Sequence, residues 1–502
     1  MGALASFARL IAAGWILVRA DALAPREIDP ILPVGPRALA RALRIFSGPA
    51  SRRGRAGERL ARCLETLGPV AIKFGQFLAT RADIFGGLFC EDLSRLKDRL
   101  APFPTAEARA EIERGLGRPL SAIFASFEEP IAAASLAQAH RVTLLDGRPG
   151  AVKVLRPGIE ARVARDGAAL KLAGDIIGAW VPAARRLEPE ALVATVLRTL
   201  QLELDLRLEA AGADELRVAM AADPYMRAPR VIWEGVAQRV LTLELAQGIA
   251  LSDPLSLQQP GLDRRGLADN LVRAFLAQAL DHGVFHADLH EGNLFVEAPA
   301  ILTAVDFGII GRLGPGERRY LAEILWGFLQ RDYPRVAAIH FDAGYVRADQ
   351  DRAAFAQALR AVGEPVFGRT ATNLSMGRLL AQLFQITALF DMRLRPELVL
   401  LQKTMVTVEG VARVIDPDHD IWAAAEPVVR RWIARELSPV ARARSLARDA
   451  FAAVAALARL AEREQEPPLL IPARNDTVTP LLAFACGVVV AALAFALTVL
   501  VR

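Results

Sequence analysis

The sequence HADLHEGN at residues 286–293, followed by VDFG at residues 305–308, decides what kind of fold this chain adopts. It places Asp288 five positions before Asn293, and a second aspartate, Asp306, at the end of an apolar stretch. This order is typical of phosphoryl-transfer sites, in which one carboxylate orients or deprotonates the attacking group. The Asn and the second Asp supply oxygen ligands that hold Mg²⁺ against a nucleoside triphosphate. We therefore predict Asp288 as the catalytic carboxylate, and Asn293 and Asp306 as ligands of Mg²⁺ in a complex with ATP.

A lysine upstream has the context of a phosphate-binding residue. Lys153 stands in the short apolar stretch AVKV at residues 151–154. An ammonium on such a strand bridges phosphate oxygens, provided that a helix carboxylate holds it in place. Glu203, Asp205 and Glu209 follow downstream, and we predict that Glu209 is the partner of Lys153.

These three carboxylates lie in a stretch that we expect to be one helix, from about residue 189 to residue 221. The alternation of apolar and charged residues at 202–208 by itself favours a strand. The absence of β-branched and aromatic residues there favours a helix. On a continuous helix, Asp205 and Glu209 are four positions apart and share a face.

An alanine-rich segment takes the place, about twenty residues before Lys153, where protein kinases carry a glycine-rich loop. Small side chains still let the backbone approach phosphates, but alanine lacks the freedom of glycine at positive φ, so this loop should be stiffer. We predict that the segment contacts the nucleotide, and it comprises Ile131, Ala132, Ala133, Ala134, Ser135, Leu136, Ala137, Gln138 and Ala139.

The catalytic loop leaves the substrate class open. Kinases of small molecules, such as aminoglycoside or choline kinases, carry the same His-x-Asp-x-x-x-x-Asn pattern. The arginine that many protein kinases place after the His is Ala287 here. No Gly-x-x-x-x-Gly-Lys-Ser/Thr stretch occurs in the sequence, which argues against a P-loop architecture.

The predicted strands are few and grouped. They are two hairpins, at 138–144 with 151–155 and at 293–296 with 302–305, and two single strands at 230–233 and 240–245. The rest is helical in composition, so we expect an α+β, protein-kinase-like bilobal fold. Its expected parts are a helical N-terminal extension (1–118), a small lobe (119–248), a large helical lobe with further C-terminal helices (249–465), and a hinge with a transmembrane helix (466–502).

Composition points to a membrane and away from nucleic acid. Hydrophobic residues make up 53% of the 502 residues, and the net charge is only +5, with no segment that concentrates basic and aromatic residues. The three cysteines, Cys63, Cys90 and Cys486, are too far apart for a metal or redox motif, which fits a reduced compartment.

The clearest membrane signal is the apolar run at 481–501, which is long enough to cross a bilayer. A buried core helix is the alternative, but the run has no polar stripe. Many arginines precede it and only Arg502 follows, so the body of the chain should be cytoplasmic. The apolar run at 10–18 imitates a signal peptide, but Arg19 follows it directly, and we expect an amphipathic helix lying on the membrane or on the protein.

Several of these segments together resemble the UbiB family of atypical kinase-like proteins. The resemblance runs from about Lys73 to Gly308 and is carried by IKFGQFLATRAD at residues 72–83, the alanine-rich loop, Lys153, Glu203-Leu204-Asp205 and the catalytic loop. It implies that Lys73, Gly75 and Gln76 belong to a lid folded over the active site, with Glu203 and Asp205 as its Glu-x-Asp element. The family often has Pro where this chain has Leu289 and Glu291, a departure that concerns loop stiffness, because neither position supplies a ligand.

The resemblance also implies a function. Members of the family support ubiquinone biosynthesis, bind ATP with Mg²⁺, and show ATPase activity rather than clear protein phosphorylation. Bacterial members end in hydrophobic helices in the inner membrane; some have two, where this chain shows one span. We therefore expect a membrane-anchored ATPase of the bacterial inner membrane, whose partners are membrane lipid, quinone precursors and other ubiquinone biosynthesis proteins. A genuine protein or small-molecule kinase, and a scaffold that uses nucleotide only as a switch, are the alternatives.

Overall fold

The computed structural model describes residues 3–23, 25–31, 34–79, 86–94, 96, 100–180, 188–367, 389–390, 392 and 396–436. The chain divides into two compact units, Met1–Ala434 and Arg435–Arg502, and nearly all of the described residues belong to the first. Within the described ranges, no helix combines the length and the apolar character needed to cross a membrane. The membrane span predicted at 481–501 lies outside those ranges.

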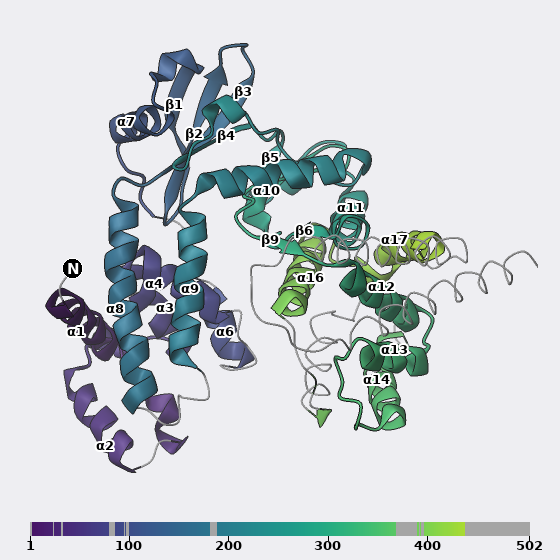
Figure 1. Ribbon diagram of the computed structural model, residues 1–502, viewed down its shortest axis with the longest axis horizontal. Helices are drawn as coiled ribbons and strands as arrows, with labels where there is room; N and C mark the ends of the chain where they lie inside the picture. The colour runs from purple at the N-terminus through teal and green to yellow at the C-terminus, as the bar shows by residue number, and fades with distance from the viewer. Residues whose placement is uncertain are drawn as a thin grey trace, which may run out of the picture. The chain divides into compact units, whose positions relative to one another are not determined.

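The helices and strands follow one another along the described chain (Figure 1). The helices are α1 (Ala3–Arg19), α2 (Val34–Leu43), α3 (Ala56–Leu67), α4 (Pro69–Ala79), α6 (Gly87–Ser94), α7 (Thr105–Leu116), α8 (Ile159–Trp180), α9 (Pro189–Glu203), α10 (Leu206–Ala219), α11 (Arg264–Ala277), α12 (Pro315–Leu329), α13 (Tyr333–Asp342), α14 (Arg352–Phe367), α16 (Pro396–Ile415) and α17 (Ile421–Glu436). The strands are β1 (Phe124–Ala133), β2 (Ala137–Leu144), β3 (Pro149–Leu155), β4 (Val240–Glu244), β5 (Ile249–Ala250), β6 (Val284–His286), β7 (Leu294–Glu297), β8 (Ile301–Ala304) and β9 (Ile310–Arg312).

The small lobe is built on an antiparallel sheet with the strand order β1-β2-β3-β4 (Figure 1). The predicted hairpin of β2 and β3 is confirmed, and Gly147 in its turn has φ +84°, the left-handed conformation that favours glycine. Helix α7 packs on the sheet, and Ala108 and Ile112 join Val142, Val152 and Val154 in one buried core. Strand β3, which carries Lys153, is therefore paired on both edges and fixed from one face.

The strand predicted at 230–233 is wrong. Val231 makes only an isolated bridge to Leu243, and Trp233–Gly235 is a 3₁₀ turn. At this point the chain crosses closely over β4, where the Thr242 hydroxyl donates a hydrogen bond of 2.9 Å to the carbonyl of Gly235. The segment does make two backbone hydrogen bonds of 2.9 Å with β4, from Ile232 to Thr242 and from Glu244 to Arg230, but the 3₁₀ turn ends the pairing after this single bridge.

Strand β1 was not predicted. Its sequence contains Glu128, Glu129 and Pro130, which interrupt any alternation of apolar and polar residues. Proline cannot donate to a ladder and is tolerated at an edge, which is the place that β1 takes in the sheet.

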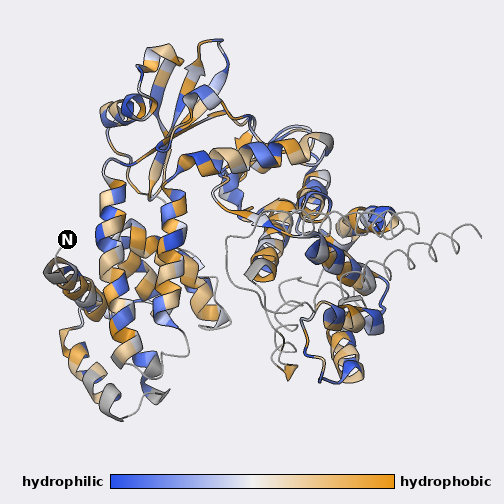
Figure 2. Ribbon diagram, in the orientation of Figure 1, coloured by the Kyte–Doolittle hydropathy of each residue, from blue (hydrophilic) through white to orange (hydrophobic). Residues whose placement is uncertain are grey.

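The N-terminal helices form a core of their own. Ala61, Leu64, Leu78, Leu93 and Leu96 are buried together where α3, α4 and α6 meet. Helix α4 is largely apolar (Figure 2) and also packs against α8 and α9. The N-terminal helix predicted around 10–18 is present as α1, which packs against α8 and is joined to it by an ion pair between Arg9 and Asp166.

The single helix expected from about 189 to 221 is broken. Helix α9 ends at Glu203, and α10 begins at Leu206. Asp205 between them has extended backbone, and its carboxylate accepts a hydrogen bond of 3.1 Å from the N–H of Arg207, as an N-cap residue does. The expectation that Asp205 and Glu209 share one helix face is therefore wrong, because Asp205 starts a new helix instead of continuing the old one.

In the large lobe, short strands position the two motif loops. The predicted hairpin is confirmed as β7 and β8, with bounds that differ by one residue. Strand β6 pairs with β9, so the chain enters the catalytic loop from β6 and leaves the Asp-Phe-Gly segment into β9. Strands β5, β6 and β9 were not predicted, because two or three residues are too few to show a period.

Candidate functional site

An ion pair between Lys153 and Glu209 joins β3 to α10. Nζ of Lys153 lies 2.8 Å from each carboxylate oxygen of Glu209 and 3.5 Å from Oδ1 of Asp306. The Glu209 side chain is only 9% exposed, and that of Lys153 26%. Two predicted site residues, Glu209 from a helix and Asp306 from a loop, therefore surround the ammonium of a third, Lys153 on its strand.

The charges of this group depend on one another. Burial by itself lowers the pKa of Lys153, but the carboxylates of Asp306 and Glu209 outweigh that effect and raise the pKa above its ordinary value. The Lys153 ammonium in turn holds the pKa of Asp306 at about 2. Burial raises the pKa of Glu209, against the opposing effect of the ammonium. At neutral pH, Lys153 is thus a cation and Asp306 an anion.

Asp306 has an unusual backbone conformation. Its φ is +61°, which costs a residue other than glycine about 1 kcal/mol or more and persists only where the surroundings enforce it. The next residue, Phe307, is buried, and its ring packs against the ring of His286 at 5.4 Å. Strain of this kind gathers at functional sites, which supports the prediction made for Asp306.

His286 ties the two motif loops together. Its Nε2 lies 3.1 Å from the carbonyl oxygen of Val305, and its Nδ1 accepts a hydrogen bond of 3.1 Å from the N–H of Asp288. Burial lowers the pKa of His286, so the ring is neutral at pH 7, with the proton on Nε2. His286, the first residue of the motif, therefore has a structural role, and this role could be recognised only in the structure.

Hydrogen bonds between its own residues hold the catalytic loop in place. Nδ2 of Asn293 donates a hydrogen bond of 3.0 Å to the carbonyl of Asp288, and Nδ1 of His290 accepts one of 3.0 Å from the N–H of Gly292. Leu289 is fully buried. These contacts order the loop.

The predicted metal ligands fit Mg²⁺. The N–H of Val305, next to Asp306, donates a hydrogen bond of 2.9 Å to the carbonyl of Asn293, so the backbone brings the two candidate ligands close. The bond from Nδ2 leaves the amide oxygen of Asn293 facing elsewhere, available to a cation. An amide oxygen and an ionised carboxylate are hard ligands, and Mg²⁺ is usually held by one or two such groups together with phosphate oxygens and water.

The alanine-rich segment is the turn between β1 and β2. Residues 131–133 end β1, and residues 137–139 begin β2, where Ala139 lies opposite Lys153 in the neighbouring strand. Arg156 holds the turn through two hydrogen bonds. Its side-chain Nε donates one of 3.0 Å to the carbonyl of Ala134, and its backbone N–H donates one of 2.9 Å to the carbonyl of Leu136. The turn is thus held by Arg156, and the stiffness that its alanines would give stays a prediction.

Gln138 has a further role in the fold. Its buried amide accepts a hydrogen bond from the N–H of Phe103 (2.9 Å) and donates one to the carbonyl of the same residue (3.1 Å). These bonds fasten the segment before α7 to β2.

The predicted lid residues occupy α4 and the junction of α9 with α10. Nζ of Lys73 lies 2.8 Å from Oε2 of Glu203. The charge of Lys73 also lowers the pKa of both Lys153 and Asp306, so α4 lies within electrostatic reach of the site. Asp205 instead pairs with the guanidinium of Arg207 at 2.7 Å.

Gly75 and Gln76 complete the predicted lid. A Cβ at Gly75 would lie 2.4 Å from Cδ1 of Leu96 and 2.5 Å from Cδ1 of Leu64, so only glycine lets α4 approach α3 this closely. Gln76 is half-buried on the same helix.

Helix α16 brings two residues to the catalytic loop that were not predicted. The Thr404 hydroxyl lies 3.2 Å from the carbonyl of Ala287, and Nζ of Lys403 lies 3.8 Å from Oδ1 of Asp288. Nothing in their local sequence marks either residue, because they meet the loop only through tertiary packing.

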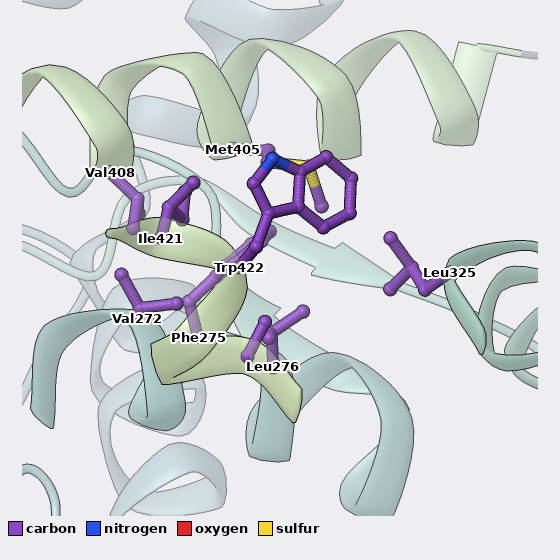
Figure 3. A pocket seen from close by; sticks show the side chains of 9 residues that line it. Val272, Phe275, Leu276, Leu325, Met405, Val408, Ile421 and Trp422 are labelled. Atoms are coloured by element: carbon purple, nitrogen blue, oxygen red, sulfur yellow. The ribbon is translucent and has the colours of Figure 1, made fainter. Parts of the chain in front are cut away.

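An apolar cavity lies between α16 and its neighbouring helices (Figure 3). It is lined by hydrophobic side chains from four helices: Val272, Phe275, Leu276, Leu325, Met405, Val408, Ile421, Trp422 and Ala425. Its volume of about 20 Å³ suffices for roughly one water molecule. It therefore marks close packing of α16 against α11 and α17 and has no room for a substrate.

The sheet with its lysine–glutamate pair, together with the loops of Asp288 and Asp306, defines a kinase-like protein. In agreement, the ABC1 atypical kinase-like domain matches residues 95–340, and the UbiB helical domain matches residues 359–420. The chain belongs to the UbiB family of atypical kinases.

Curated relatives cover most of the chain. The probable protein kinase UbiB of Marinobacter nauticus is 40% identical over 395 residues, which are 78% of this chain and 72% of that protein. The probable protein kinase UbiB of Pseudomonas fluorescens is 39% identical over 391 residues, which are 77% of this chain and 73% of that protein. Both relatives are bacterial.

A solved structure shares the fold. The Mycobacterium tuberculosis protein Rv3197, in a complex with erythromycin, matches with a TM-score of 0.54 over 74% of this chain and 95% of that chain. At 22% sequence identity, this likeness shows the fold alone.

Proposed function

We propose that this protein is a membrane-anchored ATPase that binds ATP with Mg²⁺ and supports ubiquinone biosynthesis by acting on quinone precursors or on the enzymes that modify them. One observation carries the catalytic part. Lys153 is held by Glu209 and Asp306 at 2.8 and 3.5 Å, in the arrangement that phosphoryl-transfer enzymes need before they can bind triphosphate productively. Membership of the UbiB family supports the link to ubiquinone.

The residues have separable tasks in the proposed reaction. Lys153 binds phosphate oxygens, and the alanine-rich turn covers them with its backbone. The Asp288 carboxylate orients the attacking water and accepts its proton while a new O–P bond forms and ADP leaves, which yields phosphate and ADP. Asn293 and Asp306 would hold Mg²⁺, which supplies positive charge to the phosphate oxygens.

Two features support the membrane part of the proposal. The charge-free run at 481–501 is preceded by many arginines in the sequence. In addition, Phe7, Ile11 and Trp15 on α1 are exposed and lie four residues apart, on one face of the helix. Such a face suits contact with lipid.

The test is ATP turnover by the full-length protein in detergent, with and without a phenolic mimic of a quinone precursor. We expect turnover that depends on Mg²⁺, increases with the phenol and falls to a small residual rate in Asp288→Asn. Turnover that persisted unchanged in that variant would remove the catalytic role of Asp288. In cells, deletion of the gene should lower quinone and accumulate an intermediate, and normal quinone levels would contradict the biosynthetic role.

A genuine kinase is the second candidate, because the relatives are named probable protein kinases. Labelled γ-phosphate appearing in stoichiometric amount on a protein or lipid, rather than as free phosphate, would favour it over the ATPase.

A further inference from the structure

Two consecutive residues of α16 contact two consecutive residues of the catalytic loop. Thr404 holds the carbonyl of Ala287 at 3.2 Å, and the ammonium of Lys403 lies 3.8 Å from the carboxylate of Asp288. Thr404 and Ala287 are 117 positions apart in the sequence, so this contact is a product of the fold. Both α16 residues lie in the segment that matches the UbiB helical domain, outside the segment that matches the kinase-like domain.

The packing of α16 does not require Lys403. The part of the helix around Lys403 is packed through four buried residues: Leu401, Thr404, Met405 and Val408 (Figure 3 shows Met405 and Val408). Lys403 itself is not one of them, and its side chain is 39% exposed.

The positive charge of Lys403 lies where it can act on Asp288. Asp288 is an anion that must face a triphosphate of the same sign, and like charges at close range oppose binding and reaction. The other basic side chain near this carboxylate, His290, lies 3.7 Å from Oδ2 and is a cation only when protonated. An ammonium beside Oδ1 offsets the repulsion without depending on that protonation.

We propose that Lys403 is a positioning residue of the active site: its ammonium orients the Asp288 carboxylate toward the attacking water and offsets its repulsion from the γ-phosphoryl group. This inference rests on the proposed ATPase function. In the step itself, the attacking water gives a proton to Asp288, the new O–P bond forms, and the bond from phosphorus to the leaving ADP oxygen breaks, which yields phosphate and ADP. Lys403 forms and breaks no bond in this step. The helical domain therefore completes the active site of the kinase-like domain.

The test compares four single variants of the full-length protein in detergent. Lys403→Met keeps the length of the side chain and removes its charge, whereas Lys403→Arg keeps the charge. Val406→Ala is the matched control, since Val406 is exposed on the same helix, three positions further on. The fourth variant is Asp288→Asn, which is also combined with Lys403→Met.

We expect Lys403→Met to lower kcat for ATP hydrolysis at least about tenfold, as the loss of one preorganised charge does. The melting temperature should stay the same, because the ion pair is exposed. A fluorescent ATP analogue should bind somewhat more weakly, because the repulsion between Asp288 and the γ-phosphoryl group is no longer offset. Lys403→Arg should restore most of kcat, and Val406→Ala should equal the wild type. Adding Lys403→Met to Asp288→Asn should cause no further loss, because residues that act as one unit are not additive.

Three results would overturn the inference while leaving the ATPase intact: wild-type kcat in Lys403→Met, equal losses in the Met and Arg variants, or a full additive loss in the double variant. A wild-type protein without ATP turnover would instead contradict the proposed function, and this inference with it. Met and Arg variants that lost folding together would show that Lys403 has a structural role.

Discussion

Replacing Glu209 by Gln removes one of the two carboxylates that hold Lys153. At an effective dielectric constant of about 20, charges 2.8 Å apart attract by roughly 6 kcal/mol before desolvation is counted. Asp306 remains 3.5 Å from the ammonium, with an attraction of roughly 5 kcal/mol on the same scale. The net loss of stability should therefore fall below the ~3–5 kcal/mol of a fully broken buried pair, and we expect about 1–3 kcal/mol.

The same change should affect activity more strongly than stability. Without Glu209, the ammonium is held only by Asp306 and draws that carboxylate away from Mg²⁺. We expect kcat/KM for ATP hydrolysis to fall about 100-fold or more, because the lysine–glutamate pair must be in place for phosphoryl transfer. The melting temperature of the full-length protein should fall by only about 1–3 °C, because the entropy of unfolding of a chain of 502 residues is large.

Glu215→Gln is the matched control, because it makes the same substitution on the same helix. Glu215 pairs with Arg312, and their side chains are 40% and 64% exposed, so the pair contributes about 0–1 kcal/mol. This variant should keep its activity and nearly all of its stability. If Glu209→Gln matched the wild type in both measurements, or if Glu215→Gln lost as much, the reasoning about the buried pair would be refuted.

Three further predictions concern the lid, the metal ligand and a buried histidine. Gly75→Ala should lower stability by about 1–3 kcal/mol, measured by thermal unfolding, since the added methyl overpacks α4; an unchanged melting temperature would mean that α4 shifts freely. Asp306→Asn should keep the fold, because Asn tolerates positive φ, but should lower kcat/KM about 100-fold and raise the Mg²⁺ concentration needed for turnover; normal Mg²⁺ dependence would exclude Asp306 as a ligand. Burial lowers the pKa of His340 from 6.5 to about 4, so the unfolded chain binds more protons between these values and stability is lost as pH falls from about 6.5 to about 4. His340→Phe should flatten that fall by up to about 3 kcal/mol in chemical unfolding at several pH values, and an unchanged slope would show that the ring is not buried in solution.

Much of the fold could be predicted where the signal is local. The Asp146-Gly147 turn between apolar runs specifies the β2–β3 hairpin. Two short apolar stretches, predicted at 293–296 and 302–305, specify the second hairpin. The predictions failed where the competing signal was tertiary or too short. Asp205 ends one helix and caps the next, and the alternation around it shows neither event. The two- and three-residue strands have no period to detect.

The candidate site shows the same division. By itself, the sequence determined the chemical groups: an aspartate and an asparagine at fixed spacing, an Asp-Phe-Gly, and a strand lysine, since the spacing within one loop or strand is set by backbone geometry. It also predicted the pairing of Lys153 with Glu209, but the other partners were decided by the tertiary structure. The tertiary structure placed Glu203 rather than Asp205 beside Lys73, put His286 between the two motif loops, and brought Lys403 from a distant helix to Asp288. Such contacts arise from the packing of whole helices against one another, and no period or spacing within a single segment encodes them.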